Sequence, residues 1–169
     1  MEIHLYDFDN TLFRSPYPPE SAVDKKGRSK WWGGIASMTP PAVPRKPGNE
    51  WWVPSVVKSA RKSIADPNVY AILMTGRSNM VFKRRVYELL KQQGLNFDEV
   101  KLSPSDSRTE VVKRKRIYDL LLKYPQTQMV KIWDDRDHVA TFGTLVKKLG
   151  YKVKIHKVVA KPMQAGEAK

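Results

Sequence analysis

The sequence predicts an α/β protein in which helices flank a mostly parallel β-sheet. Strand-like and helix-like segments alternate along most of the 169 residues, as expected of strands joined by helical crossovers. The run 69–74, Val-Tyr-Ala-Ile-Leu-Met, is almost continuously apolar, as in a strand that is covered on both faces. Polar clusters follow three of the strand-like runs, at the edge where such sheets bind ligands.

Local patterns place the individual elements. An apolar run from residue 3 predicts the first strand, and Pro54 suits the first turn of a helix from 55 to about 65. Ser78 is placed to cap the helix that follows strand 69–74, and Gly94 to end it. The later predicted elements are a strand at 97–102, a helix at 110–123 capped by Thr109, a strand at 129–133, a helix at 139–149 and an edge strand at 151–156.

Two predictions concern helix faces. The face of the 79–93 segment that carries Lys83, Arg84 and Arg85 is expected to meet solvent, because apolar residues occupy the opposite stripe. Along 110–123, the residues expected to face the core, or to have neighbours that do, are Val112, Tyr118, Leu121 and Leu122.

Residues 14–53 form a Pro- and Trp-rich insert with little periodicity. Its seven prolines exclude a regular helix or a central strand. We expect one tryptophan from each of the pairs Trp31-Trp32 and Trp51-Trp52 to pack in the core, and the other to be a candidate platform for a nucleic acid base. The predicted organisation is one domain at 1–160, without a large cap domain, and a flexible tail at 161–169.

The charge of the chain favours a polyanionic partner. There are 31 Lys and Arg against 17 Asp and Glu, which gives a net charge of +14 at pH 7 and favours nucleic acid over an anionic membrane. The absence of cysteine excludes disulfides and thiolate metal sites. We expect a monomeric, cytoplasmic protein, because the sequence shows neither a membrane-spanning run nor a signal peptide.

Two carboxylates two residues apart follow the first strand. If the chain stays extended, Asp7 and Asp9 point the same way, and their charges repel unless a cation intervenes or a pKa rises. Mg²⁺ is the usual cation for such oxygen ligands. A solvated turn is the simpler alternative. Thr75 and Asp134-Asp135, which end two further strands, favour a shared site instead.

These clusters resemble the motifs of the haloacid dehalogenase (HAD) superfamily of phosphotransferases. The resemblance covers Asp7-Phe8-Asp9-Asn10-Thr11, Thr75-Gly76-Arg77, Lys113 and Asp134-Asp135, in the required order, and implies a HAD-like, Rossmann-type fold. The Trp pair and the Asp-Asp-Arg-x-His run make the chain similar to the HAD domains called Swiss Army knife RNA repair-like, and to the phosphatase domain of polynucleotide kinase–phosphatase. The sequence has no P-loop, so we expect no kinase half in it.

The resemblance implies a role for each catalytic residue. Asp7 is the expected nucleophile, which forms an aspartyl-phosphate. Asp9 is the expected general acid and base, a role that requires its pKa to lie above the ordinary value. Thr75 and Lys113 are expected to hold and neutralise the phosphoryl oxygens.

The resemblance also implies a cofactor and a set of substrate contacts. Mg²⁺ is expected on Asp7, on the backbone carbonyl of Asp9, and on Asp134 or Asp135. The further residues expected to bind substrate are Asn10, Thr11, Gly76, Arg77, Arg14, Trp31, Trp32 and His138.

Several of these residues have simpler structural interpretations. Lys115 competes with Lys113 for the phosphate, and either lysine could be solvated. Thr75 could cap a helix, and Arg77 suits an ion pair with the acidic cluster better than catalysis. His138 suits a helix start, and Arg14 could be solvated.

The predicted activity is a Mg²⁺-dependent phosphatase that removes terminal, 3′ phosphates from nucleic acid. A small insert leaves the site open to a bulky substrate, and the basic charge favours a polyanion. Two alternatives remain: a phosphatase of phosphoproteins or small phosphate esters, and a non-catalytic nucleic-acid-binding module. The choice between DNA and RNA is also left open.

Overall fold

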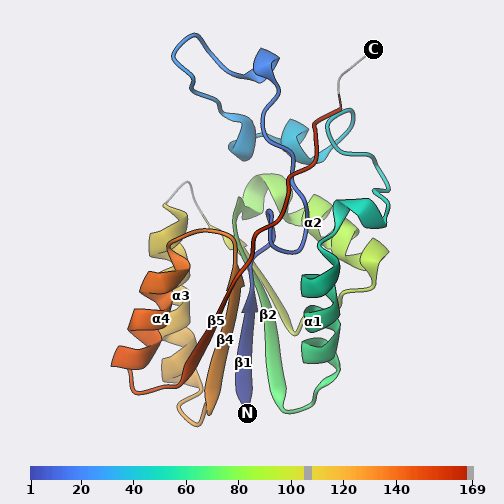
Figure 1. Ribbon diagram of the computed structural model, residues 1–169. Helices are drawn as coiled ribbons and strands as arrows, with labels where there is room; N and C mark the ends of the chain where they lie inside the picture. The colour runs from blue at the N-terminus through green and yellow to red at the C-terminus, as the bar shows by residue number, and fades with distance from the viewer. Residues whose placement is uncertain (105–107, 167–169) are drawn as a thin grey trace.

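The structure is a computed structural model that describes residues 1–104 and 108–166. Five strands form one sheet in the order β3-β2-β1-β4-β5, and all neighbouring strands are parallel. This arrangement confirms the predicted α/β class, and Figure 1 shows the strands rising side by side. The strands are β1 (Glu2–Tyr6), β2 (Val69–Ser78), β3 (Glu99–Ser103), β4 (Met129–Asp134) and β5 (Val153–Lys157).

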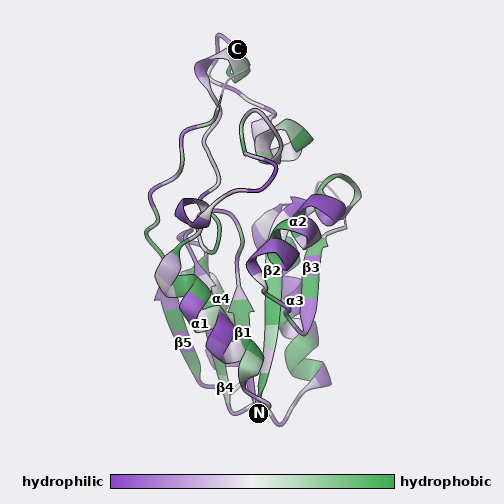
Figure 2. Cartoon of the chain, turned by 90° about the vertical axis from the view of Figure 1, so that its right-hand side faces the viewer, coloured by the Kyte–Doolittle hydropathy of each residue, from purple (hydrophilic) through white to green (hydrophobic). Residues whose placement is uncertain are grey.

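Two pairs of helices cover the two faces of the sheet. The pair α1 (Pro54–Ala65) and α2 (Asn79–Gln93) lies on one side, and the pair α3 (Thr109–Lys123) and α4 (Val139–Lys148) on the other (Figure 1). Successive residues of β1 point to opposite faces, so Ile3 and Leu5 join the apolar cluster under α3 and α4, whereas Tyr6 joins the cluster under α1 and α2. The strands are correspondingly coloured as mostly hydrophobic in Figure 2.

Three predicted details of the elements differ in the structure. Strand β2 continues beyond residue 74 to Ser78, with an irregularity in its pairing to β3 after Met74. Helix α3 begins at Thr109 itself, and Arg108 occupies the capping position. Arg85 is buried rather than solvent-exposed, because its guanidinium meets carbonyls of the insert.

The buried stripe of α3 also differs from the prediction. Tyr118 and Leu122 are exposed, and the residues that face inward are Lys113, Ile117, Leu120 and Leu121. The helix is rotated because Lys113 bonds carboxylates at the end of the sheet. An apolar count along the helix cannot include a buried lysine, so the predicted stripe was displaced by one residue.

The insert lies over the carboxyl ends of the strands (Figure 1). It contains four short 3-10 helices, at Glu20–Ala22, Trp31–Gly33, Ile35–Met38 and Asn49–Trp51. Trp51 and Trp52 are both buried in the core, where we expected only one of them. Both rings pack against Phe13, at centroid distances of 5.8 and 5.0 Å. The second half of the insert is therefore part of the core.

The chain after β5 runs back to the insert, as the red trace in Figure 1 shows. The Arg14 Nε donates to the Lys161 carbonyl at 2.6 Å, and the Gly166 N–H donates to the Ala42 carbonyl at 3.2 Å. We expected a flexible tail from 161, yet residues 161–166 have these fixed partners; residues 167–169 lie outside the described part. Within residues 1–104 and 108–166, no helix has both the length and the apolarity needed to cross a bilayer.

Candidate active site

A cavity of about 440 Å³ opens at the carboxyl ends of β1, β2 and β4. A larger cavity of about 950 Å³ lies between α2 and β3, but none of the predicted catalytic residues lines it. The chemistry therefore belongs to the smaller cavity. Its lining consists of Asp7, Asp9, Asn10, Tyr17, Trp32, Gly76, Arg77, Thr109, Lys113, Asp135 and Arg136.

Asp7 is positioned by the register of β1. Its N–H donates to the Trp133 carbonyl at 2.9 Å, which extends the ladder with β4 by one residue. Asp7 shares the parity of Ile3 and Leu5, so its side chain is directed toward the α3 face of the sheet. The Thr11 hydroxyl donates to Oδ2 at 3.1 Å. Burial and the neighbouring acidic side chains raise the pKa of Asp7 well above its ordinary value.

Lys113 joins two of the acidic residues. Its Nζ lies 2.8 Å from Asp7 Oδ1 and 2.9 Å from Asp134 Oδ2, and the residue is only 4% exposed. Burial lowers the pKa of Lys113, but the two carboxylates outweigh burial and raise it, so the ammonium form is held. Lys115, the competing candidate, pairs with Asp119 on the exposed side of α3. The structure thus brings Lys113 to the site, and not Lys115.

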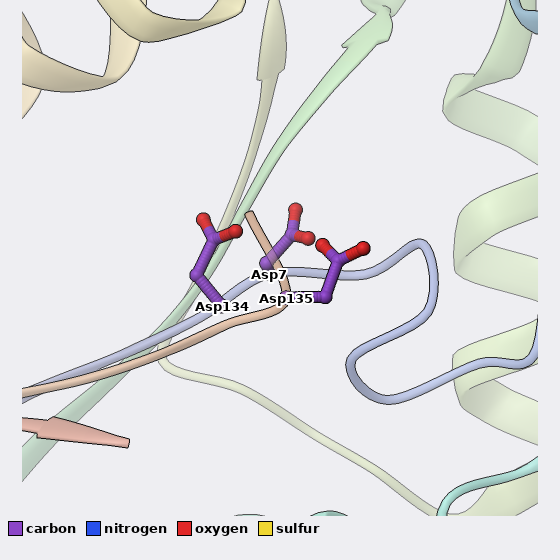
Figure 3. Close-up of side chains that lie close together, drawn as sticks. All are labelled: Asp7, Asp134 and Asp135. Atoms are coloured by element: carbon purple, nitrogen blue, oxygen red, sulfur yellow. The ribbon is translucent and has the colours of Figure 1, made fainter. Parts of the chain in front are cut away.

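Asp7, Asp134 and Asp135 form a cluster that suits a divalent cation. Each offers a carboxylate oxygen, and these oxygens lie within 4.8 Å of one another (Figure 3). The Oδ1 atoms of Asp135 and Asn10 are buried and have no hydrogen-bond partner. One ammonium group does not balance three carboxylates, and oxygen ligands with spare lone pairs are what Mg²⁺ requires. The residues present therefore fit the expected metal.

The members of the cluster differ in their surroundings. Asp134 is buried, but the hydrogen bond to His138, the Lys113 charge and the Arg136 N–H outweigh burial and hold its pKa well below the usual range. Burial raises the pKa of Asp135, and the Asp134 charge adds to that effect. A cation in the cluster favours the ionised form of each ligand.

Asp9 does not have the raised pKa that we expected. Its Oδ2 accepts from Arg77 Nε at 2.9 Å, and its Oδ1 accepts from Arg77 Nη2 at 2.8 Å and from the Ser15 hydroxyl at 2.5 Å. Burial raises the pKa of Asp9, but the Arg77 charge and these hydrogen bonds outweigh burial and leave it below the ordinary value. That prediction was wrong, because the sequence does not show which cation meets Asp9.

Arg77 connects the site to the insert. Besides the two bonds to Asp9, its Nη1 donates to the Trp32 carbonyl at 2.9 Å and to the Ser37 hydroxyl at 2.6 Å. Its guanidinium carbon lies 4.6 Å from the centre of the Phe82 ring and 5.2 Å from that of Trp32. Arg77 lines the cavity, yet its donors are largely used by the protein, in agreement with the structural alternative.

Three other predicted residues lie behind the cavity lining. The Thr75 hydroxyl accepts the Arg77 N–H at 3.1 Å, and Thr11 bonds Asp7. His138 Nε2 is 3.1 Å from Asp134 Oδ2, so His138 orients a carboxylate. These side chains support the residues that line the cavity, and none of the three contributes to the lining itself.

Arg14 and Trp31 also lie outside the cavity lining. Arg14 donates to the carbonyls of Glu50 and Lys161, and the Trp31 Nε1 donates to the Pro16 carbonyl at 3.0 Å. We expected both to bind substrate, but these bonds make them fasteners of the insert. Trp32 is the member of its pair that reaches the cavity.

Sequence reasoning missed four residues of the site. They are Ser15, which bonds Asp9, and three that line the cavity, namely Tyr17, Thr109 and Arg136. Arg136 lies within the recognised Asp-Asp-Arg-x-His run, so its place beside Asp135 was a usable signal. Ser15 and Tyr17 lie in the irregular insert, where the sequence carries no periodic signal of orientation.

The chain matches a family model described as "HAD domain family 1 in Swiss Army Knife RNA repair proteins" over residues 21–167. A Saccharomyces cerevisiae protein, described as "Uncharacterized protein YMR265C", is 26% identical over 160 residues; the match covers 81% of this chain and 35% of the yeast protein. The chain thus spans about a third of the length of this curated relative.

Two solved structures are similar in fold. They are titled "Structure of Pnkp1/Rnl/Hen1 complex" and "Structure of the Pnkp1/Rnl/Hen1 RNA repair complex", each with a TM-score of 0.55, at 14% and 17% identity. Each match covers 93% of this chain, but only 46% and 42% of the respective solved chains. At this identity the likeness concerns the fold.

Proposed function

The chain belongs to HAD domain family 1 of Swiss Army Knife RNA repair proteins, and from this membership we propose that it is a Mg²⁺-dependent phosphatase that removes terminal phosphates, at 3′ ends, from nucleic acid. The observation that carries the proposal is the Asp7 carboxylate at the cavity floor, bonded to both Lys113 and Thr11 beside a cluster that fits a cation. A buried carboxylate needs that charge compensation to act as a nucleophile.

The metal would be held by Asp7, Asp134 and Asp135, with the Asp9 backbone carbonyl as the remaining predicted ligand. When bound, Mg²⁺ supplies positive charge that offsets the phosphoryl oxygens and the clustered carboxylates. His138 and the Arg136 N–H hold Asp134 in place for that purpose.

The reaction proceeds in two displacements. An Asp7 carboxylate oxygen attacks phosphorus, the phosphorus–oxygen ester bond breaks, and the leaving alkoxide takes a proton from Asp9. Asp9 then accepts a proton from water, which attacks the aspartyl-phosphate and releases inorganic phosphate, and Asp7 is restored. Lys113 offsets the negative charge on the phosphoryl oxygens at both stages.

The Arg77 pair sets a condition on this mechanism. Asp9 is ionised while both its oxygens accept from Arg77, so it is ready as the base of the second step. An arriving phosphate dianion disfavours the ionised form, because like charges repel. Proton uptake by Asp9 therefore accompanies substrate binding.

The substrate class follows from charge and access. The insert carries seven Lys and Arg against three acidic residues within 14–53, and it borders the cavity. A polyanion gains from such a surface, and its binding must weaken as salt rises. The solved fold relatives carry titles that name an RNA repair complex, which supports RNA ends as the first substrate to test.

The test is phosphate release from a 3′-phosphorylated oligonucleotide, with and without Mg²⁺, by the wild type and by Asp7→Asn. We expect release only from the wild type with Mg²⁺. A 5′-phosphorylated strand and an aryl phosphate serve as comparison substrates. Turnover of the aryl phosphate alone would refute the nucleic acid assignment and leave the phosphatase class standing. No turnover of any substrate, with salt-dependent oligonucleotide binding, would favour a binding module.

A further inference from the structure

Two aromatic side chains of the insert stand at the cavity. Tyr17 is 60% exposed and Trp32 is 37% exposed, and both line the cavity together with Asp7 and Lys113. The other tryptophan pair of the insert is buried in the core. Large exposed rings beside a polar site are a common means of holding a planar ligand group.

The two rings form a corner. Their centroids are 5.9 Å apart and their planes meet at 90°. A planar base that stacks on one ring turns its edge toward the face of the other, an arrangement that suits aromatic quadrupoles. The cavity volume of about 440 Å³ is within the range that accommodates small organic ligands.

The corner is built on fixed supports. The Trp32 carbonyl accepts from Arg77 Nη1 at 2.9 Å, and the Arg77 guanidinium lies between the Trp32 and Phe82 rings. The Trp31 Nε1 donates to the carbonyl of Pro16, the residue directly before Tyr17. Both rings are therefore held before a ligand arrives, which reduces the entropy cost of stacking.

We propose that Tyr17 and Trp32 stack the base of the terminal nucleotide whose phosphate reacts with Asp7. The inference rests on the proposed function, since it assigns the group attached to the phosphate. Both features of the ligand have a counterpart here: the acidic cluster and Lys113 receive the phosphate, and the aromatic corner receives the base. Stacking uses the π-face that every base has, so the terminal base is bound with little regard to its identity.

The test compares two oligonucleotides that carry the same terminal 3′ phosphate, one with a base on the last nucleotide and one abasic there. For the wild type, we expect KM for the abasic strand to be higher by about 5- to 100-fold, with kcat similar. In Trp32→Ala, KM for the base-bearing strand should rise to the abasic value. Trp32→Phe should restore most of the difference, and Tyr17→Ala should lose part of it.

A matched control is Tyr118→Ala, because Tyr118 is also an exposed aromatic residue but lies on α3, outside the cavity lining. It should leave the preference for the base-bearing strand unchanged. A Trp32→Ala variant that lowered kcat equally for both strands, with no change in the KM ratio, would show that Trp32 only supports the fold. Equal KM values of the wild type for both strands would also overturn the proposal.

Binding separates this proposal from the phosphatase assignment. In an Asp7→Asn background with Mg²⁺, fluorescence anisotropy of the two labelled strands gives their Kd values without turnover. We expect tighter binding of the base-bearing strand, by about 5- to 100-fold, and loss of that preference when Trp32→Ala is added. Equal Kd values refute base stacking whatever the activity, whereas a preference without phosphate release by the wild type refutes the phosphatase assignment alone.

Discussion

Arg77 holds Asp9 by a two-point ion pair, with Nε 2.9 Å from Oδ2 and Nη2 2.8 Å from Oδ1. The same guanidinium bonds the Trp32 carbonyl and the Ser37 hydroxyl, so one side chain fixes the catalytic loop and the insert together. Its planar fork is what makes these directions simultaneous, and a lysine cannot reproduce them.

Arg77→Lys should therefore lower kcat/KM for phosphate release by about 10- to 100-fold while the fold is kept. The charge remains, but the fork that orients Asp9 is lost. Steady-state kinetics give the loss, and circular dichroism checks the fold. An activity close to that of the wild type would mean that the charge of Arg77 alone suffices.

Arg85→Met should lower the free energy of unfolding by about 2–3 kcal/mol. The Arg85 guanidinium donates to the carbonyls of Met38, Pro44 and Arg45, and its removal leaves these acceptors without their donor. Urea unfolding measures the change. The control is Arg84→Met, since Arg84 is the exposed neighbour on α2 and its loss should change stability little. Equal effects of the two substitutions would contradict this account.

Gly76→Ala should destabilise the protein by about 1–3 kcal/mol, because an added Cβ would lie 2.6 Å from Thr109 Cγ2 and closer still to Oγ1. All three of the nearest atoms belong to the Thr109 side chain. Thermal unfolding of Gly76→Ala combined with Thr109→Gly should recover most of the loss. Thr109→Gly alone is the reference, and a double variant no more stable than Gly76→Ala would exclude steric overlap as the cause.

Asp135→Asn should have opposite effects with and without metal. Without a divalent cation, the substitution removes a charge from a crowded acidic cluster and should stabilise the protein by about 1 kcal/mol. The Mg²⁺-induced stabilisation, about 2.7 kcal/mol at 100 times Kd for the wild type, should be largely lost. Thermal unfolding with EDTA or Mg²⁺ tests both effects. Asp137→Asn, at the exposed pair with Lys157, is the control.

Stability should depend on pH through His4. Burial lowers the pKa of His4 and outweighs the opposing effect of Glu2, whose carboxylate lies 2.6 Å from Nε2. The unfolded chain then binds a proton more readily than the folded one. The contribution of neutral His4 is complete above about pH 6.5 and is lost as the pH falls below that value.

Urea unfolding of the wild type and of His4→Gln at pH 8 and pH 5.5 measures this contribution. The wild type should lose more stability between these values than His4→Gln does. His156 adds a contribution of the same sign, because burial also lowers its pKa, so the difference between the two proteins is the relevant quantity. Identical pH dependence would assign the effect elsewhere.

The sheet and the motif residues at its edge were predictable from the sequence, because period and apolarity report burial directly. The parallel strands and the gathering of Asp7, Lys113 and Asp134 follow from where the strands end. The partners of buried arginines were not predictable. Arg85 carries no sign in the sequence that it will bond backbone carbonyls of a segment some 40 residues away.

The insert limited the prediction for the same reason. Its path depends on long-range bonds such as Arg77 to Trp32 and Trp31 to Pro16, and not on any repeat of apolar residues. The orientation of Tyr17 was therefore not predicted, although the importance of one tryptophan in each pair was.

The pairing of Tyr6 with Trp133 across β1 and β4 has a further consequence. The two rings stack at 4.2 Å, and the next residue of each strand is a carboxylate of the acidic cluster. The separation of Asp7 from Asp134 is thus counted in residues from that pair. Conservative exchanges within either strand leave the count intact, whereas one residue inserted or deleted turns a carboxylate toward α1 and α2. The chemistry therefore constrains the length of these strands more tightly than their composition.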